Sequence, residues 1–168
     1  MKKVDCLIEN VNENYGIDVQ QWSQTAEKLF NNLMSHEEIS STCCLAGEEF
    51  KEVFFDITFT NSADTHELNK TYRGKDYPAD IITFAIFADS EDRFILDKRV
   101  VLGDIVIALD KVEEMAGEEG KTFDYELQFL IAHGILHLLG FDHQTEEEYN
   151  FVVKHQNDAI KELCNDKV

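Results

Sequence analysis

The chain has few basic residues. Its 15 lysines and arginines stand against 34 aspartates and glutamates, so the formal net charge is −19. Binding to nucleic acids depends on lysine and arginine to neutralise phosphates. An acidic body repels polyanions at long range, although salt screens this repulsion beyond about 8–10 Å. The composition disfavours DNA as a partner. The same charge is also typical of adaptation for solubility or salt, and the sequence leaves both explanations open.

Long apolar runs, proline and paired cysteines are also scarce. No run approaches the roughly 20 apolar residues of a membrane span, and the first residues lack the apolar core of a signal peptide. We therefore expect a cytoplasmic protein with no membrane partner. One proline and 43% hydrophobic residues indicate a globular chain, and a length of 168 residues favours one domain over residues 1–168. The four cysteines form no C-x-x-C pair, so free thiols are expected.

The apolar pattern predicts an α+β fold. Alternating β-branched and aromatic residues predict strands over 52–60, 81–87 and 100–109, the last one interrupted at Gly103. Apolar residues three or four apart predict helices over 19–34, from Asn61 or Ser62 to 72, and over 110–115, 123–139 and 145–164. Residues 35–50 have no clear period and are expected to form a loop that can include a strand. We predict a small mixed sheet of three to four strands that packs on the buried helix over 123–139.

Three histidines on and after that helix form the strongest chemical signal. His133, His137 and His143 are spaced i, i+4 and i+10. Residues four apart share one face of a helix, with Cβ atoms about 5–6 Å apart, so the first two can bind one ion. Gly140 favours a helix end and a turn that brings His143 back to the same ion. Three neutral imidazoles leave an open position on the metal, which is typical of catalytic zinc. We expect one Zn²⁺ per chain.

The histidine spacing resembles that of the metzincin zinc proteases, which indicates a zincin-like arrangement of the metal helix. Those proteases carry glutamate directly after the first histidine, where it acts as the general base. Here that position is Gly134, which cannot transfer a proton. Asp142 is the carboxylate nearest to the motif in the sequence. It can act as a base, or it can support a ligand histidine or cap the turn.

A second segment with chemical content is the loop over residues 72–80. Arg73 and Lys75 supply positive charge there, and Gly74 and Pro78 favour an irregular backbone. The planar guanidinium of arginine pairs with two phosphate oxygens at once. A polar loop with glycine and proline is also typical of a plain connection, so the spacing alone leaves its role open.

With both segments in view, the chain resembles the YbeY family of bacterial single-strand-specific metallo-endoribonucleases. The matching segments are HGILHLLGFDH at 133–143, YRGKDYPAD at 72–80 and LGDIVIA at 102–108. The resemblance covers about residues 52–160. One departure is Tyr125, which stands before Glu126 where the family commonly has arginine.

The resemblance implies a function and the residues that perform it. His133, His137 and His143 would be the zinc ligands, and Arg73 would act in RNA cleavage. The substrate would be single-stranded ribosomal RNA, in maturation of the 3′ end of 16S rRNA and in ribosome quality control. A ribosomal protein or an assembly GTPase is a candidate partner. Two alternatives stay open: a non-catalytic ribosome-assembly factor with a metal-stabilised fold, which suits the acidic charge, and a metzincin-like zinc protease, which Gly134 opposes.

Overall fold

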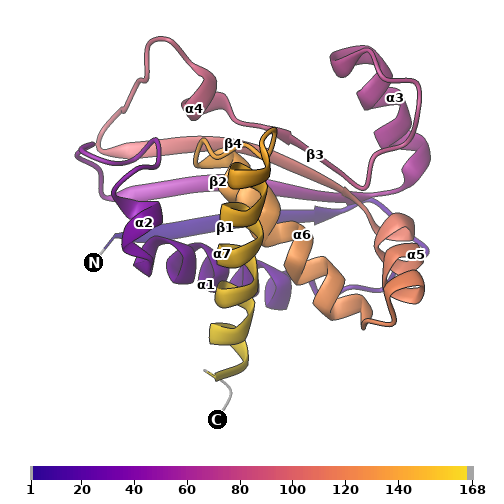
Figure 1. Ribbon diagram of the computed structural model, residues 1–168. Coiled ribbons are helices and arrows are strands. Elements are labelled where there is room, and N and C mark those ends of the chain that lie inside the picture. The colour runs from indigo at the N-terminus through magenta and orange to yellow at the C-terminus, as the bar shows by residue number, and fades with distance from the viewer. Residues whose placement is uncertain (1, 166–168) are drawn as a thin grey trace.

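A computed structural model describes residues 2–165 and shows a four-stranded mixed sheet with helices on both sides (Figure 1). The strands, in their order across the sheet, are β1 (Lys3–Asn10), β2 (Glu52–Thr60), β4 (Arg99–Ala108) and β3 (Ile81–Phe84). The first three run parallel, and β3 is antiparallel to β4. The predicted α+β class and its small mixed sheet are confirmed.

The helices surround this sheet unevenly. They are α1 (Val19–Ser35), α2 (Glu37–Ser40), α3 (Ser62–Arg73), α4 (Ile86–Asp89), α5 (Leu109–Glu119), α6 (Phe123–Leu138) and α7 (Glu146–Asn165). In the view of Figure 1, α1 and α6 lie below the sheet, α7 crosses in front, and α3 and α4 lie above. Within residues 2–165, no helix has the length and apolar character needed to cross a membrane.

Alternation in the central strand builds the core between the sheet and the lower helices. Val53, Phe55, Ile57 and Phe59 of β2 are at most 1% exposed. Phe55 stacks on Phe30 of α1, with 6.0 Å between ring centroids. Large apolar and aromatic side chains on one pleated face are what makes this segment a strand rather than a helix.

Helix α6 is buried on most of its surface, as predicted for the helix that carries the histidines. Its first turn is capped by Thr122, whose hydroxyl accepts a hydrogen bond from the backbone N–H of Tyr125 at 3.1 Å. At its other end Gly140, with φ of +99°, donates to the carbonyl of His137, and Phe141 donates to that of Leu136, both at 3.0 Å. This pair of bonds is the Schellman motif, so the predicted helix end at Gly140 is confirmed.

Two predicted boundaries on the β3 side of the fold are wrong. The strand expected over 81–87 ends at Phe84, because the chain turns into the short helix α4 at Ile86. Gly103 does not interrupt β4; the pairing with β2 shifts by one residue there, which leaves Leu102 as the extra residue of a bulge. A side chain at position 103 would meet the carbonyl oxygen of Phe84 at 1.9 Å, so only glycine fits.

Two further expectations need correction. Helix α5 continues through Gly117 to Glu119 and ends at Gly120, whose φ of +64° is the left-handed conformation of a helix end. Gly117 is tolerated inside the helix, as an exposed glycine can be at modest cost. The segment 35–50 contains the short helix α2 followed by turns, and no strand is assigned in it.

Candidate metal centre

His133 and His137 project from the last turns of α6, and the turn after Gly140 returns His143 to them. The Nε2 atoms of His133 and His137 are 2.9 Å apart, and one nitrogen from each of the three rings lies within 4.8 Å of the others. The ring centroids are 4.5–5.0 Å apart. Zinc–nitrogen bonds of about 2.0–2.1 Å place two ligands of a tetrahedral site about 3.3 Å apart. The first two rings need to open by only about 0.4 Å to reach this separation, and the ring of His143 is close enough to supply a third ligand.

The surroundings of the two helical histidines keep them neutral. Burial lowers the pKa of His137 to about 4, and the neighbouring His133 and His143 add to this effect. Burial also lowers the pKa of His133, with a further contribution from His143. Only a neutral imidazole has a free lone pair for a metal. Both rings are therefore ready to bind an ion at neutral pH without first losing a proton.

Gln156 supports the centre from α7. Its side chain is fully buried, and its amide nitrogen donates to the carbonyl of Phe129 at 3.1 Å. Its Oε1 has no partner with full hydrogen-bond geometry among residues 2–165, yet it lies near enough to His133 to raise the pKa of that ring against the larger effect of burial. Nε2 of His133 faces His137, so Nδ1 is the ring nitrogen that remains available to a neighbouring acceptor such as Gln156. Such contacts orient a ligand histidine.

The carboxylate of Asp142 lies at the turn that holds His143. Its Oδ1 accepts from the backbone N–H of His143 at 2.7 Å and lies 3.6 Å from Nδ1 of the same ring. The side chain therefore stabilises the turn next to the third histidine. This geometry favours the supporting role over that of a general base.

The three histidines line a cleft of about 380 Å³ that also contains Arg73 and Lys75. Arg73 is the last residue of α3, and Gly74 ends that helix in the left-handed conformation. The loop cations singled out in the sequence are thus brought to the same cleft as the histidine motif. Asp80, Phe129 and Tyr149 are also in the lining. The arrangement combines a candidate metal centre with groups that suit an anionic substrate.

Gly134 faces the sheet and not an open space beside the histidines. A Cβ atom there would lie 2.8 Å from Cδ1 of Ile105 and 3.1 Å from Cδ1 of Ile81. At the position that carries the general base in metzincins, a side chain would therefore fit only if these isoleucines or α6 shifted. The packing at this position, like the sequence, therefore opposes the glutamate base that a metzincin-like protease would need.

Gln156, Phe129 and Tyr149 belong to the site although the sequence did not predict them there. Gln156 did leave a signal, because it interrupts the apolar stripe of α7 that contains Val152 and Ile160. A buried amide in such a stripe needs partners inside the protein. Phe129 and Tyr149 left no such signal in the sequence, since aromatic side chains on helices are common and do not by themselves indicate a site.

Comparison with known proteins agrees with this geometry. The family model described as "Endoribonuclease YbeY" matches residues 7–164. Endoribonuclease YbeY of Bacillus licheniformis is 45% identical over 107 residues, which are 62% of this chain and 68% of the relative. The Staphylococcus carnosus protein of the same name is 38% identical over 128 residues, or 76% and 77% of the two chains. The solution structure of TM1509 from Thermotoga maritima matches with a TM-score of 0.53 and 27% identity, covering 97% of this chain and 93% of that one.

The fold, the cleft and these matches define a metal-dependent hydrolase. More specifically, the chain belongs to the endoribonuclease YbeY family. Membership implies that its substrate is an RNA.

Proposed function

We propose that residues 1–168 form one domain, a cytoplasmic zinc-dependent endoribonuclease specific for single-stranded RNA that acts in 16S rRNA 3′-end maturation and ribosome quality control. The observation that carries this proposal is the shared cleft: His133, His137 and His143 line it together with Arg73 and Lys75. Neutral nitrogen ligands suit zinc among the available metals. The ribosomal role follows from the family, whose relatives are named endoribonuclease YbeY.

Each group in the cleft has a role that its chemistry dictates. The three histidines would hold the ion. When bound, zinc lowers the pKa of a water ligand and polarises a phosphoryl oxygen. The guanidinium of Arg73 pairs with phosphate oxygens and stabilises the charge that develops on them during cleavage. Lys75 adds a second cation beside the same backbone.

The aromatic lining of the cleft supports a single-stranded substrate. Phe129 and Tyr149 both contribute to the cleft, and Tyr149 is 53% exposed. Unpaired bases stack on aromatic side chains, whereas bases inside an RNA duplex cannot. A ribosomal protein or an assembly GTPase would present the RNA.

The test follows a labelled single-stranded RNA, and a duplex of the same sequence, with zinc-loaded protein. We expect cleavage of the single strand only, its loss in His137→Ala, and a decrease of about 100- to 1000-fold in kcat for Arg73→Ala. Arg99 pairs with Glu52 at the start of β4 and is absent from the cleft lining, so Arg99→Ala is the matched control and should cleave normally.

Two outcomes contradict the proposal. Equal cleavage by all variants would identify a contaminating nuclease. If neither the wild type nor any variant cleaves although the histidine triad binds zinc, then either the chain is a non-catalytic assembly factor, which contradicts the proposal, or cleavage needs the partner, which does not. A ribosome-maturation assay with His137→Ala separates these two, because only the assembly factor keeps its function without the metal ligand.

A further inference from the structure

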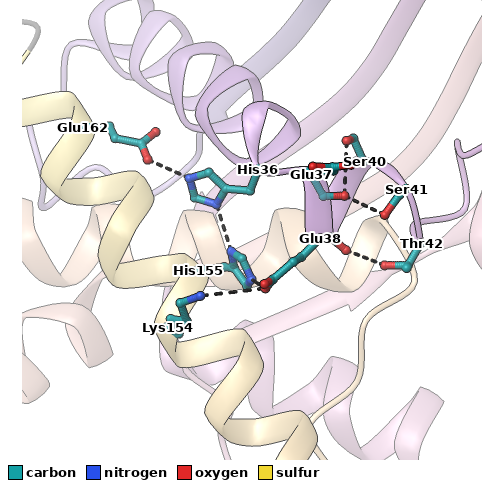
Figure 2. A network of polar contacts seen from close by, with 9 residues as sticks. All are labelled: His36, Glu37, Glu38, Ser40, Ser41, Thr42, Lys154, His155 and Glu162. Carbon is teal, nitrogen blue, oxygen red and sulfur yellow. Dashed lines mark hydrogen bonds and ion pairs between the residues drawn. The ribbon is translucent and has the colours of Figure 1, made fainter.

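A second pair of histidines lies where the junction of α1 and α2 meets α7 (Figure 2). His36 is the residue between α1 and α2, and His155 is a buried residue of α7. Their Nδ1 atoms face each other at 2.9 Å. Neither residue lines the cleft of the candidate metal centre. The family comparison and the cleft chemistry therefore give this pair no role.

The outer nitrogen of each ring is held by a carboxylate. Nε2 of His36 lies 2.6 Å from Oε1 of Glu162, and Nε2 of His155 lies 3.0 Å from Oε2 of Glu38. Figure 2 shows these four side chains in one continuous row. A carboxylate accepts hydrogen bonds, so both Nε2 atoms carry protons. Two neutral rings would then point the lone pairs of their Nδ1 atoms at each other. The 2.9 Å contact thus aims two lone pairs at one point, where a cation would be held by both rings.

We propose that this pair is a second metal site, which binds a divalent transition ion of the zinc type between the two Nδ1 atoms. Binding forms two nitrogen–metal bonds through the lone pairs of the two Nδ1 atoms, and no bond of the protein has to break. The rings already have the arrangement usual for ligand histidines, in which a carboxylate accepts the other N–H and increases the basicity of the ligand.

The distances agree with such an ion. The separation of 2.9 Å equals that between Nε2 of His133 and Nε2 of His137 in the candidate centre. Two ligands of tetrahedral zinc are about 3.3 Å apart, so the rings need to open by only about 0.4 Å. Phe151 packs on the ring of His155, with centroids 4.5 Å apart, and fixes its orientation.

The site is accessible and its surroundings favour a cation. A hollow of about 530 Å³ leads to the pair, which gives an ion a path of entry and leaves room for water as the remaining ligands. Besides the two histidines, the hollow is lined by four carboxylates and two ammonium groups: Glu37, Glu38, Asp158, Glu162, Lys154 and Lys161. With only two protein ligands, this site should bind zinc more weakly than the triad.

An ion here would tie the α1–α2 junction to α7. The next residue on α7 after His155 is Gln156, whose buried amide donates to the carbonyl of Phe129 on α6, the helix of the candidate centre. A second ion would therefore stiffen the helix that supports the first site. This inference does not depend on the activity proposed above.

The experiment is equilibrium dialysis of metal-stripped full-length protein against Zn²⁺, with excess Mg²⁺ to occupy sites made only of oxygen ligands. Wild type should hold two zinc ions per chain and His36→Ala one. His66→Ala is the matched control, because among residues 2–165 His66 pairs with the carboxylate of Asp76 and with no second histidine. This variant should hold two zinc ions. His137→Ala should lose the ion of the histidine triad but keep the ion between His36 and His155. The two variants together therefore show which of the two sites binds zinc.

A second measurement keeps the test sound if His36→Ala proves misfolded by circular dichroism. Glu162 is partly exposed, so Glu162→Gln should fold and should weaken the second site about 10- to 100-fold. One zinc per chain in wild type, two in folded His36→Ala, or unchanged affinity in Glu162→Gln would each overturn the proposal.

Discussion

Replacement of Gly134 by alanine tests the contact that positions the metal-binding helix on the sheet. The added methyl would lie 2.8 Å from Cδ1 and 3.1 Å from Cγ2 of Ile105, and 3.1 Å from Cδ1 of Ile81. Ile105 is completely buried in the core. Close packing leaves it little space to rotate away, so α6 or the side chain must move.

Two opposing effects set the magnitude. Overpacking of a core typically costs about 1–3 kcal/mol. Alanine in a helix is more stable than glycine by about 0.5–1 kcal/mol. Gly117 of α5 offers a matched control, because it is also helical and, apart from its own helix, nothing in the described residues lies within 4 Å of the position that an added methyl would take. Gly117→Ala should therefore show only the stabilisation that alanine gives to a helix. Gly134→Ala should have a free energy of unfolding about 1–3 kcal/mol lower than that of Gly117→Ala.

Urea unfolding followed by circular dichroism measures both free energies, with equal m-values as the sign that the two variants unfold alike. If Gly134→Ala is stabilised as much as Gly117→Ala, then α6 does not approach the sheet this closely. Gly134→Glu should unfold the protein or nearly so, because it buries an unpaired carboxylate among isoleucines. The variant that would restore the protease base is thus excluded by packing.

Three further predictions concern single side chains. Gln156→Ala should weaken zinc binding at the triad about 10- to 100-fold in calorimetry without loss of the site, because His133 loses its orienting partner; unchanged affinity would leave Gln156 a purely structural role. Burial, with a hydrogen bond to Glu119, raises the pKa of Glu126 from 4.5 to about 7. Between about pH 4.5 and 7 the folded protein keeps a proton on Glu126 that the unfolded chain has already released. The free energy of unfolding should therefore fall as the pH rises through this range, and Glu126→Gln should flatten the slope. A wild-type curve without the slope would contradict the shift. Cys164 is exposed while Cys6 and the adjacent pair at 43–44 are buried. One thiol per chain should react with Ellman's reagent in the native protein and four after unfolding; rapid reaction of more than one would refute the burial.

The histidine motif could be predicted from sequence because its geometry is local. The spacing of His133 and His137 and the helix end at Gly140 depend on helix periodicity and backbone freedom, which eleven residues determine by themselves. The strand β2 could be predicted equally well, since its alternation of apolar residues reflects burial on one face.

Long-range contacts account for what the sequence did not show. The end of β3 depends on the turn into α4, and the bulge at Gly103 depends on a carbonyl of Phe84 that is 19 positions away. The place of Gln156 in the site depends on how α7 packs against α6. Its sequence signal, an amide in an apolar stripe, indicates burial but not the partner.

The acidic composition and an RNA substrate are compatible because charge acts locally in the cleft. Arg73 and Lys75 line it together with Asp80, which is the one carboxylate that the described part of the chain contributes to the lining. Neutral histidines would leave a bound divalent ion its full charge, so the loaded cleft would carry net positive charge despite the −19 of the chain. Carboxylates farther away than about 8–10 Å are screened at physiological salt. Repulsion from the rest of the surface would then slow the approach of RNA rather than prevent its binding, which gives a partner that presents the RNA a physical purpose.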